Sequence, residues 1–324
     1  MNFSDIIGQS SVVKRLKQVI ESQRIGHAYL FVGPEGMGKK TIAEIFARGI
    51  MCKSQGHRPC DLCRSCRQFN SGNHPDVYWV QKGDKSSIGV EQIRSVLEDI
   101  HLKPYESSRK VYIIEDAHAM TVQAQNAFLK TLEEPPFFAT IILLAEKSNE
   151  LLPTILSRCQ VFRMQRLTRE EICTIIIRHF DMPRERAMLF AGLSDGIPGK
   201  GLQLAGSQEF HQMRSDVFKF IERIFDYGDV DKMAQWEFFN QYKDRIDEIL
   251  DMLAVWFRDI LSYKETGDSG LIINIDKLPV LEKQASMFTI GRISSIIEGI
   301  ERTRRMLKGN VNHQLAIENL LLNM

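Results

Sequence analysis

Residues 27–41 read HAYLFVGPEGMGKKT, and the architecture of the N-terminal half follows from this stretch. Ala28–Val32 is a short apolar run that is typical of a buried strand. Residues 33–39 then match the pattern G-x-x-x-x-G-K, and residues 40–51 have the apolar spacing of a helix. A strand, a glycine-rich loop and a helix in this order form the context in which such a loop binds phosphate. The stretch therefore predicts an α/β domain of nucleotide-binding type.

Outward from this stretch, apolar strands alternate with amphipathic helices. Helices are predicted over residues 11–23, 90–102 and 124–132, and strands over 77–81, 111–114 and 141–144. This alternation predicts a parallel sheet with helices on both faces. Strand signals end near residue 166, and the remaining chain has helical spacing. We therefore expect an α/β domain over residues 1–165, a small helical domain over 166–206 and an all-α domain over 207–324.

The overall charge excludes a strongly basic nucleic-acid-binding protein. The 324 residues contain 42 Lys and Arg against 41 Asp and Glu, so the formal net charge is +1. A DNA contact would have to be local or shared with partners. Neither a signal peptide nor a membrane-spanning stretch is visible, and we expect a cytoplasmic protein without membrane contact. In a reducing compartment, the six cysteines are expected to be thiols or metal ligands.

The phosphate loop departs from a working ATPase loop at its metal ligand. Gly33, Gly36 and Gly38 shape the predicted cradle, and Lys39 is placed to reach the β- and γ-phosphates. The residue after Lys39 should carry the hydroxyl that binds Mg²⁺, but Lys40 stands there and Thr41 comes one residue late. One residue turns a helix by about 100°. Either the turn adjusts so that Thr41 serves, or the loop no longer works.

The acidic residues at the end of the strand 111–114 are also unusual. Glu115 comes before Asp116, whereas a phosphate-loop ATPase usually has Asp and then Glu at this point. The shorter Asp116 would lie about one methylene away from the attacking water, and a misplacement of ~1 Å can slow a reaction about a hundredfold. The sequence therefore predicts weak or absent hydrolysis, whereas nucleotide binding is a separate question.

Cys52, Cys60, Cys63 and Cys66 have the spacing C-x7-C-x2-C-x2-C. Four thiolates so close together suit tetrahedral Zn²⁺ and leave no position for water, so the predicted site is structural. The alternative is four unligated thiols. For His57 and His74 we expect solvated loop residues rather than ligands. Packing is expected for the two remaining cysteines, Cys159 and Cys173.

Several blocks along the chain resemble bacterial clamp-loader subunits of the AAA+ class. Besides the phosphate loop and the cysteines, these blocks are IGQ at 7–9, HAYLF at 27–31, NAFLKTLEEPP at 126–136, LPTILSRC at 152–159 and the final segment from Asn310 to Leu322. The resemblance implies an AAA+ domain over 1–165 with a zinc-binding insertion at 52–66, a helical lid over 166–206 and an oligomerising collar over 207–324. Lys147 stands where gamma and tau subunits have a polar sensor residue. Together with the altered phosphate loop and the reversed acids at 115 and 116, this departure makes the chain most similar to the delta-prime branch.

The resemblance also implies a role and partners. A delta-prime-type subunit is a stator that assembles with gamma/tau-type and delta subunits of DNA polymerase III, which load the sliding clamp on primed DNA. Arg158 of the Ser-Arg-Cys block would reach ATP held by a neighbouring subunit. Lys200 stands where relatives direct an Arg at their own nucleotide. ATP or ADP fits the loop, an argument for Mg²⁺ is lacking, and no independent enzymatic activity is expected.

Alternatives remain at this stage. Arg158 could be an ordinary surface residue, and the chain could be an active gamma-type ATPase in which Thr41 reaches Mg²⁺. A zinc-dependent nucleic-acid-binding module is a third hypothesis, which the near-zero net charge disfavours. The basic residues at 301–308 are expected to form a solvated helix face, and Trp256 with Phe257 to pack in a core rather than stack on bases.

Overall fold

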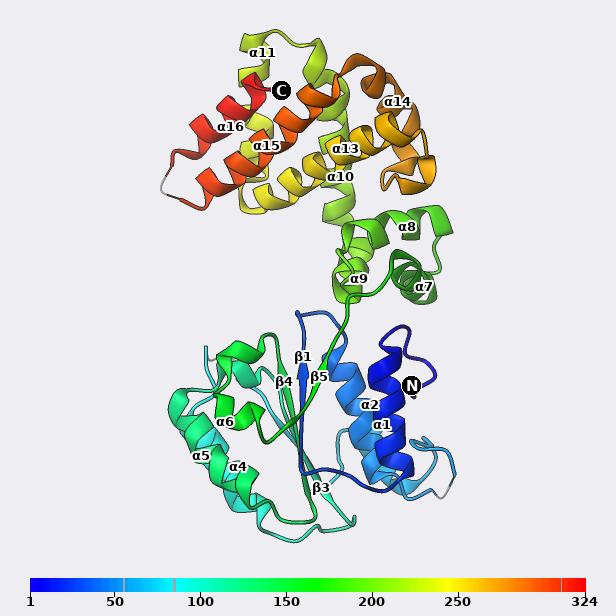
Figure 1. The fold of residues 1–324 in the computed structure, drawn as a ribbon, viewed down its shortest axis with the longest axis vertical. Coiled ribbons are helices and arrows are strands. Elements are labelled where there is room, and N and C mark those ends of the chain that lie inside the picture. The colour runs from blue at the N-terminus through cyan, green and yellow to red at the C-terminus, as the bar shows by residue number, and fades with distance from the viewer. Residues whose placement is uncertain (55, 84–85, 310) are drawn as a thin grey trace. The chain divides into compact units, whose positions relative to one another are not determined.

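The computed structural model describes residues 1–54, 56–83, 86–309 and 311–324 (Figure 1). Asn310, with which the resemblance of the final segment begins, lies outside these residues. The chain divides into two compact units, residues 1–175 with 195–200 and residues 176–194 with 201–324. The predicted boundary between a lid and a collar at residue 206 stays a prediction. No described helix has the length and apolar character needed to cross a membrane.

The first unit is built on a parallel sheet of the order β2-β3-β4-β1-β5. Every residue of β1, β3 and β4 is buried, because helices cover both faces of the sheet. The predicted α/β fold class is therefore confirmed. The strands are β1 (Ala28–Val32), β2 (Val77–Val80), β3 (Lys110–Ile114), β4 (Ala139–Ala145) and β5 (Gln160–Arg163).

Helices flank this sheet in two layers. Figure 1 shows α1 and α2 on one side of the strands and α4 and α5 on the other. The short helices η1 (Ala117–Ala119) and η2 (Ser148–Glu150) follow β3 and β4. The α-helices of this unit are α1 (Ser10–Glu21), α2 (Lys39–Met51), α3 (Arg64–Asn70), α4 (Val90–Ile100), α5 (Val122–Glu133) and α6 (Pro153–Leu156).

The rest of the described chain is helical. Trp256 is fully buried and donates from Nε1 to Gln284 Oε1 at 2.8 Å, and Phe257 is buried beside it in the chain, so the expected packing role of both is confirmed. The helices are α7 (Arg169–Phe180), α8 (Arg184–Leu193), α9 (Pro198–Gly206), α10 (Gln208–Arg223), α11 (Asp229–Ala234), α12 (Trp236–Gln241), α13 (Ile246–Thr266), α14 (Leu278–Met287), α15 (Ile290–Leu307) and α16 (His313–Leu322), with short turns η3 (Ile224–Asp226), η4 (Lys243–Arg245), η5 (Ser269–Leu271) and η6 (Ile275–Lys277).

The structure corrects three details of the sequence analysis. Strand β5 was not predicted, because its outer residues are exposed and it lacks a continuous apolar run. Helix α3 was not predicted, because it lies inside a segment with little apolar periodicity. Arg304 of the basic segment is not a solvated residue, since its guanidinium lies 2.7 Å from Asp251 and 3.8 Å from Asp247 and its side chain is only 18% exposed.

Candidate functional site

The phosphate loop joins the end of β1 to the start of α2. Gly36 and Gly38 have φ values of 77° and 83°, in the left-handed region that glycine adopts readily. The ammonium group of Lys39 donates to the carbonyl oxygens of Gly33 at 2.7 Å and Pro34 at 2.9 Å. Burial lowers the pKa of Lys39. The lysine that was predicted to reach phosphate is therefore bonded to the carbonyls of its own loop.

Lys40 occupies the place of the missing metal ligand with its own positive charge. Its Nζ lies 2.8 Å from Glu115 Oε1 and 5.2 Å from the centre of the Trp79 ring. Gln81 also donates to Glu115, at 3.0 Å. The second acid, Asp116, pairs with Lys82 at 3.2 Å. Both carboxylates at the end of β3 are thus balanced by ammonium groups of the chain.

The start of α9 lies directly on the phosphate loop. Gly199 donates its backbone N–H to Gly36 O at 2.9 Å. A Cβ atom at Gly199 would come within 2.6 Å of Gly36 Cα, so no other residue fits there without a backbone shift. The backbone nitrogen of Lys200 is also near, at 3.5 Å from a Cβ atom built at Gly36. These contacts cover the loop with backbone, and the predicted role of the Lys200 side chain stays a prediction.

Arg158 lies at the end of the sheet opposite to the phosphate loop, where the strands begin. Strands β1 and β5 run parallel, with Gln160 beside Tyr29 and Arg163 beside Val32. The phosphate loop leaves β1 after Val32, whereas Arg158 comes two residues before β5 begins. The arginine therefore stands at the amino-terminal edge of the sheet and the phosphate loop at the carboxyl-terminal edge.

Two side chains, the buried Gln125 and the partly buried Cys159, hold the segment that carries Arg158 against the rest of the unit. Gln125 of α5 is 3% exposed, and its Oε1 accepts the backbone N–H of Leu152 at 2.8 Å, just before α6. Cys159 packs against the sheet core, and burial raises the pKa of its thiol to about 12. Cys159 is therefore a neutral packing residue, as expected from the sequence, and it anchors the chain directly after Arg158.

The guanidinium of Arg158 is engaged within the chain. Its Nη2 lies 2.6 Å from Glu133 Oε1 at the end of α5. Its Nη1 donates to Thr154 O at 2.9 Å and to Ser157 Oγ at 3.3 Å. The side chain is 32% exposed. Glu133 lies within the block 126–136, but its pairing with Arg158 depends on the tertiary fold and was not predicted.

The four cysteines of the predicted zinc site converge. The Sγ atoms of Cys52, Cys60, Cys63 and Cys66 all lie within 4.8 Å of one another. Tetrahedral Zn–S bonds of ~2.3 Å would place sulfur atoms about 3.8 Å apart, so the cluster fits the metal after a small contraction. The backbone N–H of Cys63 donates to Cys60 Sγ at 3.4 Å and helps lower the pKa of Cys60 to about 6, which favours the thiolate.

His74 is a buried structural residue, which corrects the expectation of a solvated side chain. It is 5% exposed, and its Nδ1 accepts the backbone N–H of Asp76 at 3.1 Å. Its Nε2 therefore carries the proton and donates to Ser65 Oγ at 2.9 Å, while Ser65 donates to Met51 O. Burial lowers the pKa of His74, which keeps the ring neutral. This chain of bonds connects α3 to the segment before β2.

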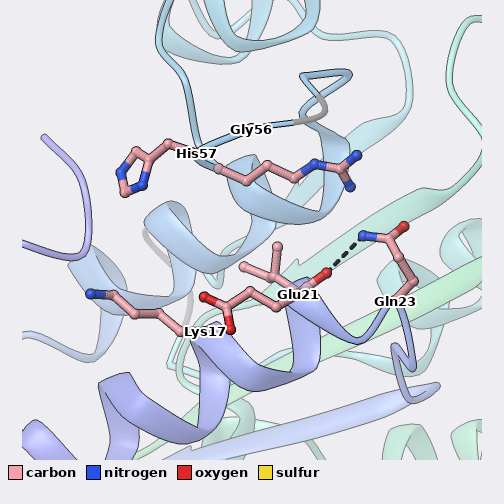
Figure 2. A pocket seen from close by; sticks show the side chains of 7 residues that line it. Lys17, Glu21, Gln23, Gly56 and His57 are labelled. Carbon is pink, nitrogen blue, oxygen red and sulfur yellow. Dashed lines mark hydrogen bonds between the residues drawn. The ribbon is translucent and has the colours of Figure 1, made fainter.

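His57 lines a separate pocket of about 460 Å³. Figure 2 shows Lys17 and Glu21 of α1 on one side of this pocket and His57 on the other. The pocket shares no lining residue with the phosphate loop, and His57 is not part of the cysteine cluster. The expectation that His57 is not a metal ligand is consistent with this position.

Comparisons with known proteins agree along the chain. Residues 8–168 match a family described as DNA polymerase III, delta subunit, and residues 208–324 match DNA polymerase III, delta subunit, C terminal. The chain is 34% identical to DNA polymerase III subunit delta' of Bacillus subtilis, over 97% of this chain and 95% of that protein. It is 31% identical to DNA polymerase III subunit tau of the same bacterium, over 98% of this chain and 60% of tau. A gamma subunit-related protein from Thermotoga maritima matches in structure at 19% identity and a TM-score of 0.44, over 95% of this chain and 96% of that one.

Proposed function

Since the chain belongs to the delta-prime family of DNA polymerase III clamp-loader subunits, we propose that it acts as a stator that supplies Arg158 to ATP held by a neighbouring subunit. The observation that carries the proposal is the separation of Arg158 from the chain's own phosphate loop, at opposite edges of one sheet. An arginine placed there serves a nucleotide on another chain. Such an arginine stabilises charge on the transferred phosphoryl group and can accelerate hydrolysis by about 10³-fold or more.

The chain's own nucleotide site supports the same division of labour. Lys40 and Lys82 neutralise Glu115 and Asp116, so the two acids lack the free charge that would attract Mg²⁺. Gly199 covers the loop, and Lys39 is bonded to loop carbonyls. We infer that ATP or ADP binds weakly if at all, without a strong Mg²⁺ requirement, and that the chain alone hydrolyses little ATP.

The cysteine cluster is proposed to hold a structural Zn²⁺. Four thiolates fill a tetrahedral shell, so the metal would stabilise the insertion at 52–66 and take no part in the reaction. The proposed partners are gamma/tau-type and delta subunits, with the sliding clamp and primed DNA bound by the whole assembly. This assembly would operate in the cytoplasm.

The test is reconstitution of the loader with gamma/tau-type and delta partners. Replacing Arg158 by Ala should lower the ATP turnover that clamp and DNA stimulate by at least about tenfold, and Arg158→Lys should restore little, because an ammonium lacks the planar fork of guanidinium. Arg163→Ala, in β5 of the same unit, is the matched control. Unchanged turnover in the Arg158→Ala complex would contradict the proposal.

An active gamma-type ATPase is the second candidate, and the similarity to tau along 98% of the chain favours it. This hypothesis requires Thr41 to bind Mg²⁺. Among the described residues, however, the Glu115 and Asp116 carboxylates have Lys40, Gln81 and Lys82 as partners, and Thr41 is not one of them. Nucleotide affinity measured with and without Mg²⁺ separates the two functions: a gamma-type subunit needs the metal, whereas a stator should show nearly equal affinities.

A further inference from the structure

Both terminal nitrogens of the Arg158 guanidinium have partners inside the chain. Nη2 is paired with Glu133 at 2.6 Å, and Nη1 donates to Thr154 O and Ser157 Oγ. A guanidinium binds a phosphate most strongly through two parallel N–H bonds from one edge. In the structure the edge formed by the two Nη atoms is already in use. Arg158 must therefore leave at least one of these contacts before it can grip a γ-phosphate with that edge.

Glu133 is the contact that opposes such a move most strongly. It is the one charged partner among the three, and a carboxylate competes directly with phosphate for the same guanidinium. If Glu133 stayed bound, it would also bring a negative charge close to the phosphate. The backbone oxygen of Thr154 and the hydroxyl of Ser157 carry no charge, and both belong to the same short segment as Arg158.

The position of Glu133 explains why it holds Arg158 in the free chain. Glu133 is the last residue of α5, where the helix dipole disfavours a carboxylate, so the guanidinium relieves an unfavourable charge. The other end of the same helix is fixed: Thr121 caps it, and Gln125 bonds the segment before α6. The pair is half-exposed, with 32% of Arg158 and 50% of Glu133 accessible, so it can open readily.

We propose that Glu133 is a resting latch for Arg158: it holds the guanidinium on α5 until a neighbour's nucleotide displaces it. Glu133 acts through Arg158 and is a positioning residue. This inference rests on the proposed role of Arg158 in trans, and its two tests are chosen so that the latch and the in-trans role fail separately.

The first test uses the isolated chain and does not depend on any partner. Phenylglyoxal modifies accessible guanidinium groups, and the extent of modification at Arg158 is read by mass spectrometry of its peptide. Glu133→Gln should increase the rate of modification at Arg158 by about two- to fivefold, the range expected for loss of an exposed ion pair. Glu134→Gln, which removes the same charge from the adjacent exposed residue, should leave the rate unchanged.

The second test uses the reconstituted loader. Glu133→Gln should raise kcat/KM for ATP by about two- to fivefold without clamp or DNA, because the free guanidinium no longer has to leave a carboxylate. The same substitution on an Arg158→Ala background should change nothing, because the latch then has no arginine to hold. Glu133→Asp should give an intermediate rate, and circular dichroism establishes that each variant is folded.

The outcomes are distinct. If Glu133→Gln leaves both the modification rate and kcat/KM unchanged, or if it acts equally on the Arg158→Ala background, the latch is refuted. If modification rises but kcat/KM does not, Glu133 holds Arg158 without any effect on the reaction, and the latch is again refuted. If Arg158→Ala itself has no effect on turnover, the in-trans role fails, whatever the modification experiment reports about Glu133.

Discussion

Lys40 places a fixed positive charge beside Glu115, where a phosphate-loop ATPase would bind Mg²⁺. Its ammonium lies 2.8 Å from Glu115, on the helix that a phosphate-loop ATPase uses to present a hydroxyl to Mg²⁺. The Lys40 ammonium neutralises Glu115 without a metal ion, but it cannot bridge the β- and γ-phosphates as Mg²⁺ does. The loop thus has the form of a nucleotide cradle, and the proposed stator role predicts that Mg²⁺ contributes little to its nucleotide affinity.

The first prediction concerns this residue. Lys40→Thr should make nucleotide affinity depend on Mg²⁺, because Glu115 regains a free charge and a hydroxyl returns to the metal position. The ratio of the affinities with and without Mg²⁺ should rise from near one by about tenfold or less, since Gly199 still covers the loop. Calorimetric titration with ATP measures the ratio. Lys53→Thr, a lysine outside the phosphate loop, is the control, and an unchanged ratio in Lys40→Thr would show that Lys40 does not replace the metal.

The second prediction concerns the ion pair between the buried Lys110, at the start of β3, and the partly exposed Asp99 of α4. Asp99 Oδ2 accepts from Tyr112 Oη at 2.6 Å and from Lys110 Nζ at 2.9 Å. Burial alone would raise the pKa of Asp99, but the hydrogen bonds from Tyr112 and Lys110 outweigh it and lower the pKa. A folded pKa below the unfolded value of ~3.9 means that the stabilisation is present above about pH 4 and is lost as the pH falls through the folded pKa.

Tyr112→Phe should therefore cost about 1.5–3 kcal/mol at pH 7 and clearly less near pH 3. Urea unfolding at the two pH values measures the difference. Tyr78→Phe is the matched control, because the Tyr78 hydroxyl lies 3.5 Å from Asp99 and contributes a weaker bond. An equal cost of Tyr112→Phe at both pH values would contradict the assignment.

Residues whose chemistry depends on close sequence spacing were predicted best. The four cysteines converge because their ligand spacing is local, and the phosphate loop lies where its strand and helix place it. The partner of Lys40 could not be predicted, because Glu115 arrives from another strand. The burial of His74 was missed for the same reason: Ser65 and Asp76 enclose it only in the folded chain.

At the scale of elements, helix α3 forms in a segment with little apolar spacing, next to cysteines of the proposed zinc site. It has seven residues, Cys63 caps its start, and Cys66 lies inside it. A helix this short is unstable alone in water. Further supports include the Ser65–His74 bond, the pairing of Arg64 with Glu106 at 3.0 Å and the bond from Gln68 to Glu106 at 3.0 Å.

The third prediction is that Cys63→Ser removes the metal and loosens this element. Zinc content should fall from about one atom per chain to well below half, and the melting temperature should fall, because a structural metal contributes directly to folding. Elemental analysis after gel filtration and a thermal melt provide the measurements. Cys159→Ser changes a cysteine of the same unit outside the cluster and should keep the zinc. Full metal content in Cys63→Ser would exclude this ligand set.

The three inner strands were predicted, and so was the edge strand β2, because its residues Val77–Val80 form an apolar run. Strands β1, β3 and β4 are continuous apolar runs in the sequence because each has strands on both sides and helices above and below. Strand β5 lies at the edge, with Gln160 and Arg163 exposed, so its local composition does not distinguish it from a loop. Strand β5 is therefore defined by its pairing with β1 and not by its own residues.

At the scale of the whole molecule, the observed division differs from the predicted one in the place of α8. This helix was predicted to belong to a separate lid, but it clusters with the C-terminal unit. Within the C-terminal unit, Phe190 of α8 packs edge-on to Phe210 of α10, with ring centres 6.4 Å apart. Gly192 approaches Ile273 so closely that a Cβ atom would lie 2.8 Å from its side chain. These contacts join α8 to residues on the other side of the predicted boundary at residue 206.

The fourth prediction uses tryptophan fluorescence to test that division. In a Trp79→Phe background, Trp236 and Trp256 remain, and both belong to the C-terminal unit. Phe190→Ala should destabilise the transition that they report by about 3 kcal/mol or more, because a buried aromatic ring is lost. Phe128→Ala, equally buried in the first unit, should leave this transition nearly unchanged. If Phe190→Ala leaves the transition reported by Trp236 and Trp256 unchanged, the result would favour a lid that folds independently of the collar.

The contact between Gly36 and Gly199 has a consequence for how such a subunit can change over time. Restoring ATP hydrolysis would require a hydroxyl at position 40, a reordering of residues 115 and 116, and withdrawal of the backbone at Gly199 from the loop. Each of these changes leaves the other obstacles in place, so a single substitution is not expected to restore hydrolysis. If the chain acts as the proposed stator, several changes would therefore have to occur together before it could hydrolyse ATP.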